Sequence, residues 1–227
     1  MTGIIAAMDA ELIDIKNALE NKEEQVISGR TFVSGTIGTE QVVCVICGIG
    51  KVNAAVCAEA MIMAYHPDRI INTGVGGAIG GHLHVCDVVC ADYLVQHDVD
   101  TTALGDEIGM VSTVNLVRFH ADKAFADALC AIMNEQCVHC VRGGIATGDK
   151  FVADFNTKAF ISTTFKCIAC DMEGCAIAQV CCLNNVPFAV LRAISDGADE
   201  SATMSYTEFM PKAAAISAGV LLGLLRK

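Results

Sequence analysis

Residues 167–199, CIACDMEGCAIAQVCCLNNVPFAVLRAISDGAD, decide the fold of this chain. An apolar run leads into Glu173, a helical pattern follows, and Asn184–Asn185 ends it. Pro187 then opens a second strand-like run, which ends at Asp196. A strand, a helix and a strand of these lengths predict a βαβ unit with a parallel sheet as its partner. Ligands bind beyond the carboxyl ends of such strands, so two acids at adjacent strand ends suggest a site.

Length and composition favour a single domain over residues 1–227, because no Pro/Gly/Ser-rich or charge-rich stretch divides the chain. Apolar residues make up 53% of the sequence. They are mostly Ala, Val, Ile and Cys, which suits strands buried on both faces and a sizeable subunit interface. The net charge of −11 argues against a nucleic-acid partner, which needs a basic surface.

Neither end of the sequence predicts a membrane segment. The start, MTGIIAAMDAEL, lacks a basic region and meets an acid at once, unlike a secretory signal. The apolar run AAAISAGVLLGLL near the other end is too short to span a bilayer and predicts a buried helix. We therefore expect a cytoplasmic protein that does not contact a membrane.

The thirteen cysteines include three C-x-x-C pairs, at 44/47, 137/140 and 167/170. Two pairs lie in strand-like runs, where residues i and i+3 face opposite sides of a sheet and cannot close a zinc site. The third, CVHC, offers His139 between its cysteines, and His82 with His84 is a second weak metal signal. Buried cysteines acting as small hydrophobes and a solvated histidine loop are the preferred interpretations. So many thiols indicate a reducing compartment.

Periodicity and turn residues predict the remaining elements. Residues 2–8 predict a strand, after which Asp9 caps a helix that carries Glu11 in its first turn. The stretch 74–81, GVGGAIGG, predicts a turn and not a dinucleotide site, because its glycines miss the required spacing. Other expected elements are strands near 31–38, 40–48, 69–74, 82–98 and 138–146, helices through Met63, near 121–136 and over 206–225, and a long loop over 98–119.

Several motifs follow one another along the chain in a specific order: GIIAAMDAE, GIGKVNAA, INTGVGG, QHDVD, GDKF, DMEGCAIAQV and VPFAVLRAISDGAD. In that order and spacing they resemble the methylthioadenosine/S-adenosylhomocysteine nucleosidases of the nucleoside phosphorylase superfamily, nearly from end to end. The resemblance implies an α/β fold in one domain, with three layers and a mixed, partly closed central sheet flanked by helices. It also implies a homodimer that hydrolyses the N-glycosidic bond to release adenine, in methionine salvage, without metal or organic cofactor.

The resemblance assigns roles to particular residues of this sequence. Asp196 would protonate adenine N7, and Glu11 would activate the attacking water. Glu173 would bind the ribose hydroxyls, Phe151 would stack on the purine, and the Val152 backbone would reach the adenine edge. Further pocket residues would be Met8, Ile49, Gly77, Met172, Arg192, Ser195 and Tyr206, with Leu104 of the 98–119 loop reaching the partner subunit's 5′ pocket.

The chemistry of glycosidic cleavage asks for the same parts. Adenine leaves readily only when protonated, so one carboxylic acid must keep its proton near neutral pH. A second carboxylate on the opposite face of the sugar should activate water, as in an inverting glycosidase. Arg192 lies in an apolar run, so it needs a carboxylate partner or a polar site to justify its burial. A phenylalanine directly after the Gly148–Asp149 turn is a candidate for stacking on a flat ring.

Three other functions stay open on the sequence alone. A purine nucleoside phosphorylase on the same fold would need an arginine cluster for phosphate, whereas Arg30, Arg69, Arg118 and Arg142 are scattered along the chain. A futalosine-type nucleosidase would share most of the motifs. A catalytically silent nucleoside-binding protein is disfavoured by the three intact acids.

Overall fold

The computed structural model describes residues 1–80, 83–112, 114–198 and 202–226. Its strands are β1 (Thr2–Ala6), β2 (Glu20–Ile27), β3 (Arg30–Ile37), β4 (Glu40–Ile46), β5 (Arg69–Asn72), β6 (Val75–Ala78), β7 (Val88–Gln96), β8 (Phe119–His120), β9 (Cys140–Thr147), β10 (Cys167–Asp171) and β11 (Phe188–Asp196). The helices are α1 (Asp9–Ala18), α2 (Lys51–Tyr65), α3 (Lys123–Glu135), α4 (Phe155–Phe165), α5 (Gly174–Asn184) and α6 (Ala202–Leu225), with a 3-10 turn η1 (Thr102–Leu104).

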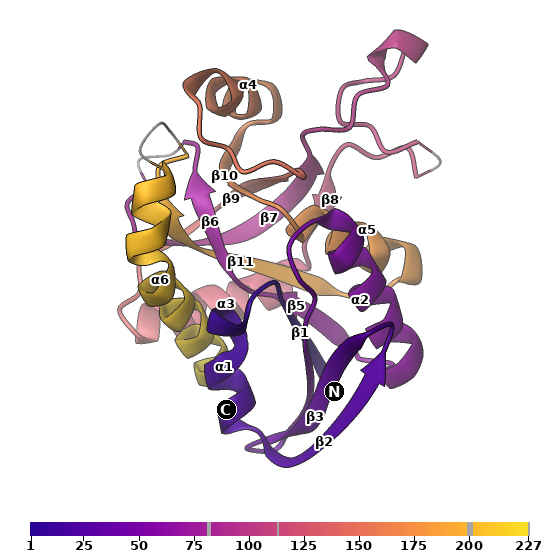
Figure 1. Cartoon of the computed structure of the whole chain (residues 1–227), viewed down its shortest axis with the longest axis vertical. Helices are drawn as coiled ribbons and strands as arrows, with labels where there is room; N and C mark the ends of the chain where they lie inside the picture. The colour runs from indigo at the N-terminus through magenta and orange to yellow at the C-terminus, as the bar shows by residue number, and fades with distance from the viewer. Residues whose placement is uncertain (81–82, 113, 199–201, 227) are drawn as a thin grey trace.

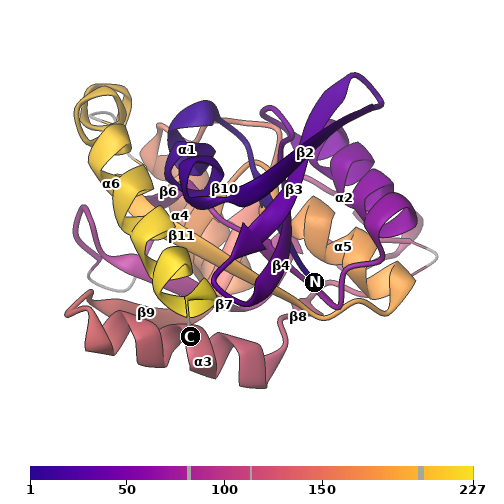
Figure 2. The ribbon, with the colours of Figure 1, turned by 90° about the horizontal axis from the view of Figure 1, so that it is seen from below.

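The described strands form one mixed sheet in the order β2-β3-β4-β1-β5-β11-β6-β10-β9-β7-β8. Strand β7 also pairs with β11, so β11, β6, β10, β9 and β7 close a ring. Helices α1, α3 and α6 pack together on one side of the sheet, and α2 packs with α5 on the other (Figures 1 and 2). This arrangement confirms the expected three-layer α/β fold with a partly closed sheet.

Each side of the sheet has its own apolar core. Leu12 and Ile15 of α1 share one cluster with Leu129 of α3 and Leu221 of α6. The other cluster joins α2 and α5 to the opposite face of the strands. Because both faces are covered, strand β11 is buried at every position from Phe188 to Asp196, and most of its residues are apolar.

The predicted strand, helix and strand exist as β10, α5 and β11, but the two strands are neither neighbours nor parallel, so the predicted parallel βαβ unit is wrong. Strand β6 lies between them, antiparallel to β10 and parallel to β11. The first half of the predicted glycine turn is therefore a strand and not a turn. Glycine fits this place because a Cβ on Gly76 would lie 2.8 Å from the carbonyl oxygen of Cys170.

Strand β2 and helix α4 are the longest elements without a sequence prediction. Strand β2 is exposed along almost its whole length and reads ENKEEQVI, so it lacks an apolar alternation and forms only because it pairs with β3 at the sheet edge. Helix α4 begins at Asp154, whose carboxylate accepts a hydrogen bond from the Thr157 N–H, but its sequence has no apolar stripe. The long loop over 98–119 is confirmed as largely irregular, and it extends away from the body of the molecule (Figure 1).

Helix α6 is longer than the apolar run that predicted it. By length and composition alone, its residues Ser205–Leu225 would suffice to cross a membrane, with a mean hydropathy of 1.4. In the structure, however, Ala214, Ser217 and Leu221 are buried, and α6 packs against α1 and β11. The Ser217 hydroxyl lies 2.6 Å from that of Thr73. The contacts are those of a core helix of this fold.

Most cysteines behave as small hydrophobes, as expected. Cys44, Cys47, Cys57, Cys90, Cys167, Cys170, Cys175 and Cys181 are buried. His139 of the CVHC motif pairs with Asp87 at 3.0 Å. His84 faces the same carboxylate at 3.6 Å, whereas His82 lies outside the described residues. In the described part of the chain, no group of three or more His, Cys, Asp or Glu side chains is arranged to hold a metal.

The two-sided core makes a matched stability test possible on α1. Ile15 is fully buried, whereas Ile13 on the same helix is 52% exposed. Ile15→Ala should lower the free energy of unfolding by about 2–5 kcal/mol, because it leaves a cavity between α1 and the sheet. Ile13→Ala should change it by less than about 1 kcal/mol. Urea denaturation at one protein concentration measures both, and equal losses would contradict the described packing.

Candidate active site

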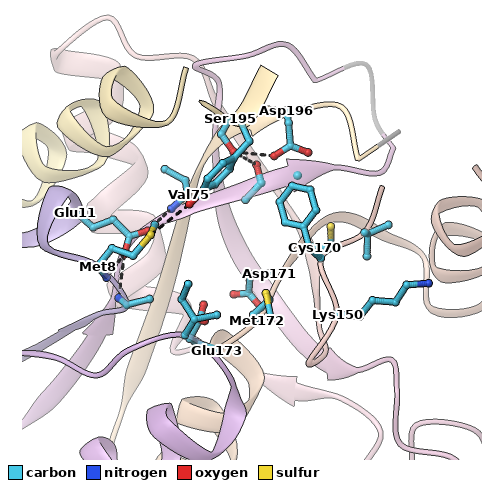
Figure 3. A pocket seen from close by; sticks show the side chains of 17 residues that line it. Met8, Glu11, Val75, Lys150, Cys170, Asp171, Met172, Glu173, Ser195 and Asp196 are labelled. Carbon is cyan, nitrogen blue, oxygen red and sulfur yellow. Dashed lines mark hydrogen bonds between the residues drawn. The ribbon is translucent and has the colours of Figure 1, made fainter. Parts of the chain in front are cut away.

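A cavity of about 350 Å³ lies at one edge of the closed ring of strands (Figure 3). Residues of β6, β10 and β11, of the loops after β1, β4, β9 and β10, and of helices α1 and α6 form its walls. Of the residues assigned to the site by resemblance, the lining includes all but Arg192 and Leu104: Met8, Glu11, Ile49, Gly77, Phe151, Val152, Met172, Glu173, Ser195, Asp196 and Tyr206.

Glu11 enters the cavity from the first turn of α1. Its Oε2 accepts hydrogen bonds from the Ala7 and Met8 N–H groups, each at 2.9 Å, and its Oε1 accepts one from the Val75 N–H at 3.0 Å. A Cβ at position 74 would lie 2.6 Å from Oε1, so a glycine is required there. Burial raises the pKa of Glu11, while the Arg192 charge and the three N–H groups oppose that rise. The helix begins at Asp9 with Met8 as its cap, so the predicted Asp9 cap is wrong.

Asp196 ends β11 on another side of the cavity from Glu11 (Figure 3). Its side chain is 2% exposed. The Oδ2 atom lies 2.8 Å from the Ser195 hydroxyl, and Oδ1 accepts a hydrogen bond from the Ala198 N–H at 2.8 Å. Gly77 pairs with both Asp196 and Cys170, and a Cβ there would lie 2.9 Å from Oδ1. Because Gly77 has no side chain, the Asp196 carboxyl group has room beside it.

Behind the cavity, Arg192 is 1% exposed and lies among acids. Its Nη2 forms an ion pair with Asp171 at 2.6 Å and lies 3.9 Å from Glu173. The Arg192 side chain also donates to the Asn72 side chain and to the Leu191 carbonyl. The carboxylate partner that burial requires is therefore Asp171. Arg192 itself does not line the cavity but neutralises part of the charge beside it.

Glu173 follows β10 and faces the cavity. Its Oε1 accepts a hydrogen bond of 2.9 Å from the Gly50 N–H. Burial first, and the charge of Asp171 second, raise the pKa of Glu173 to about 7. This carboxyl group can therefore exchange a proton near neutral pH.

Two aromatic rings form an apolar wall of the cavity. The rings of Phe151 and Tyr206 meet edge to face, with centroids 5.6 Å apart. The Tyr206 hydroxyl lies 3.3 Å from the sulfur of Met8. Phe151 is 42% exposed, which leaves a ring face for a flat ligand. Such a wall suits a planar heterocycle.

Three motifs that lie far apart in the sequence meet at the mouth of the cavity. The Lys51 ammonium donates to Asp98 at 2.6 Å and to Gln96 at 3.1 Å. The Asp149 carboxylate accepts from the Lys51 N–H at 2.8 Å, and the Asp149 N–H donates to Asp98 at 2.9 Å. These bonds tie the GIGK, QHD and GDKF segments together and hold Gly50 against Glu173.

Leu104 lies on the projecting loop and is 83% exposed, so the chain does not bring it to its own cavity. Sequence reasoning missed other lining residues: Ala7, Val75, Gly76, Lys150, Cys170 and Asp171. Each lies within two residues of one that was assigned. Closeness to a motif was therefore the one sequence signal for these residues. Whether each of them faces the cavity depends on strand pairing, which the sequence does not give.

Comparisons with known proteins agree with this geometry. The model of the Phosphorylase superfamily matches residues 2–226. A 5′-methylthioadenosine/S-adenosylhomocysteine nucleosidase of Shewanella halifaxensis is 37% identical, over 99% of this chain and 98% of its own length. The nucleosidase of that name from Neisseria meningitidis, solved with methylthio-immucillin-A, has a TM-score of 0.95 at 34% identity, covering 99% of this chain and 98% of the other.

A futalosine hydrolase of Helicobacter pylori has a similar structure, with a TM-score of 0.94 at 33% identity over 98% of this chain and 96% of its own. The shared fold and the match over nearly the whole chain define the superfamily. The chain belongs to the phosphorylase superfamily and, within it, to the 5′-methylthioadenosine/S-adenosylhomocysteine nucleosidases, which are hydrolases of N-glycosidic bonds.

The raised pKa of Glu173 predicts a pH-dependent effect on stability. Its folded-state pKa of about 7 exceeds the usual value for glutamate, so ionisation of Glu173 above pH 7 destabilises the folded state. Glu173→Gln should therefore raise the free energy of unfolding by about 1–3 kcal/mol at pH 8 and change it little at pH 4, where the wild-type group is protonated in both states.

Urea denaturation of wild type and variant at both pH values measures this difference. Glu208→Gln, at an exposed position of α6, is the matched control and should show no pH-dependent gain. A gain for Glu173→Gln of the same size at pH 4 and pH 8 would contradict the assignment.

Proposed function

We propose that this protein hydrolyses the N-glycosidic bond of 5′-methylthioadenosine and S-adenosylhomocysteine and releases adenine. The observation that carries the proposal is the placing of Glu11 and Asp196 on different sides of one cavity, with Phe151 and Tyr206 as its aromatic wall. The named relatives support the choice of substrates.

Asp196 is the proposed general acid, which donates its proton to N7 of adenine. The Ser195 hydroxyl has one proton and lies near two acceptors, Asp196 Oδ2 at 2.8 Å and the Gly76 carbonyl at 3.3 Å. When the hydroxyl donates to Gly76, its oxygen can accept the Asp196 proton, so the acid form is held in the cavity. The leaving base then departs neutral, which removes the main barrier to cleavage.

Glu11 is the proposed general base for the attacking water. Three backbone N–H groups fix both of its oxygens, and a fixed carboxylate can orient a water toward the sugar. Glu173, held by the Gly50 N–H, is the proposed ligand of the ribose hydroxyls. The purine would lie between the Phe151 and Tyr206 rings on one side and the Val152 backbone on the other. Arg192 is a positioning residue in this proposal, because it acts through the neighbouring acids.

The lining supports hydrolysis over phosphorolysis. A phosphorylase must bind phosphate beside the sugar, which favours arginine at that place. Among the described residues that line the cavity, Lys150 is the single lysine or arginine, and it pairs with Asp154. Arg30 contacts Asn53, and Arg142 pairs with Asp92, both outside the lining. A futalosine-type substrate stays the second candidate, supported by the Helicobacter pylori structure.

The proposed activity places the protein in methionine salvage, where it would clear by-products of S-adenosylmethionine use in the cytoplasm. Activity is tested by release of the free base, which is adenine from methylthioadenosine, adenosylhomocysteine and adenosine, and hypoxanthine from futalosine. Release from the first two substrates supports the proposal. Release from futalosine alone would replace it with the second candidate.

Removal of either proposed catalytic acid should abolish turnover. Asp196→Asn cannot protonate adenine, and Glu11→Gln cannot accept a proton from water. Each should lower kcat for methylthioadenosine by at least about a hundredfold, the usual scale for a missing acid or base. Asp9→Asn, at an exposed position beside Glu11, is the control and should keep kcat. Near wild-type turnover by Asp196→Asn would show that another group is the acid.

We further propose a homodimer whose neighbouring loop completes the 5′ side of the cavity. Helix α2 exposes Val52 and Met63 at 75% and 65%, and α5 exposes Leu183 at 60%. A surface groove beside them is lined by apolar and small residues, among them Ile27, Ala55, Val56, Ala60 and Val180. The projecting 98–119 loop lies on the same side of the molecule as α2 and α5 (Figures 1 and 2). A second copy of this chain fits these features, because apolar helix faces pair well with themselves about a twofold axis.

This dimer can be broken at its proposed centre. Val56→Glu should give a monomer in sedimentation equilibrium, because it places an unpaired charge in an apolar interface. The monomer should show a larger rise in KM for methylthioadenosine than fall in kcat, since the partner's Leu104 no longer covers the 5′ substituent. Leu104→Asp should stay dimeric and share the rise in KM. Ile13→Glu on the opposite helix layer is the control, and a fully active Val56→Glu monomer would contradict the proposal.

A further inference from the structure

Three cysteine side chains meet where α3 crosses β7 and β9, away from the cavity. Cys130 of α3 and Cys140 of β9 have their sulfur atoms 3.1 Å apart. Cys90 of β7 is fully buried, and its sulfur lies 3.8 Å from the carbonyl oxygen of Ala126 on α3, one helical turn before Cys130. None of the three lines the cavity, and the proposed hydrolysis uses none of them. The cluster is therefore a feature that the reaction does not explain.

The surroundings of Cys130 favour its thiolate. The Arg142 guanidinium places a positive charge near this sulfur. The neighbouring Cys90 thiol first, and the Cys140 thiol and the Arg142 charge next, lower the pKa of Cys130 to about 6 against the effect of burial. The same neighbours raise the pKa values of Cys90 and Cys140. Asp92 and Asp127 also pair with Arg142 and compete for its charge, but their side chains are 44% and 52% exposed, so water screens them.

We propose that Cys130 and Cys140 are a peroxide-reactive thiol pair, with Cys130 as the nucleophile and Cys140 as the thiol that closes the disulfide. The Cys130 thiolate attacks one oxygen of hydrogen peroxide, the O–O bond breaks, and hydroxide leaves and takes a proton to become water. The Cys140 sulfur then attacks the sulfenic sulfur, and a second water leaves with the thiol proton. Two thiols are oxidised and one peroxide is reduced to two waters.

The geometry favours a Cys130–Cys140 disulfide over the other cysteine pairs nearby. A disulfide needs sulfur atoms about 2.05 Å apart, so closure asks for a movement of about 1 Å. Cys130 and Cys140 are both partly exposed, which admits peroxide, whereas Cys90 is fully buried. Cys137 is exposed and lies only three residues from Cys140, which makes it the competing partner.

Exposure alone predicts a different order of reaction. Cys137 and Cys182 are the exposed cysteines, and they would react first if access decided the rate. If the cluster activates its thiol, Cys130 reacts first although it is less exposed. The two explanations therefore separate in a labelling experiment.

Reduced wild-type protein is first treated with a limiting amount of iodoacetamide at pH 7. Cys130 should be alkylated about tenfold faster than Cys182, because a thiol with a lowered pKa is largely thiolate at that pH. In a second sample, hydrogen peroxide should remove two free thiols per chain and two hydrogens of mass. Cleavage after Glu135 places Cys130 in one peptide and Cys137 with Cys140 in another, so a Cys130–Cys140 bond joins the two peptides.

Matched variants decide between pairings. Cys137→Ser should keep the disulfide, and Cys130→Ser should lose it, while both keep adenine release within about twofold of wild type, because the cluster lies outside the cavity. A Cys137–Cys140 or Cys90–Cys130 bond, or alkylation of Cys130 no faster than Cys182, would overturn the proposal. The outcome is independent of the hydrolase activity, since Asp196→Asn protein should form the same disulfide.

Discussion

The buried guanidinium of Arg192 is the contact on which the rest of the cavity depends. A cation with 1% exposure persists only with a close carboxylate, and Asp171 supplies it. Glu173 and Glu11 lie within the reach of the same charge, so three acids share one arginine. One positive charge cannot offset three negative ones in so little water. The pKa values of Glu11 and Glu173 are raised as a result of this burial.

The closed ring of strands explains why this cluster can form at all. Strand β11 carries Arg192 and Asp196, and β10 carries Asp171. Strand β6 lies between them, and its two glycines have no side chains that would fill the space. Helix α1, which follows β1, contributes Glu11. Groups that lie more than 180 residues apart in the sequence, such as Glu11 and Asp196, thus face one space. The fold holds the acids before any ligand arrives.

The sequence predicted local features well and pairing poorly. Asn184–Asn185, Pro187 and the apolar FAVLRAIS run bounded their elements correctly, because turn residues and burial act locally. The insertion of β6 between β10 and β11 was missed, since glycine carries no periodic signal and its strand exists only through its partners. The pairing of Asp171 with Arg192 was likewise not predicted, because it depends on tertiary contacts. Leu104 was assigned by resemblance, and one chain alone leaves it exposed.

The central claim is that the cavity uses water, and not phosphate, to cleave a glycosidic bond. The most direct measurement is the identity of the sugar product when wild-type protein turns over methylthioadenosine in a buffer rich in inorganic phosphate. The lining, with Lys150 as its one described lysine or arginine and already paired with Asp154, predicts free methylthioribose at a rate that phosphate does not change. Formation of methylthioribose 1-phosphate would contradict the account.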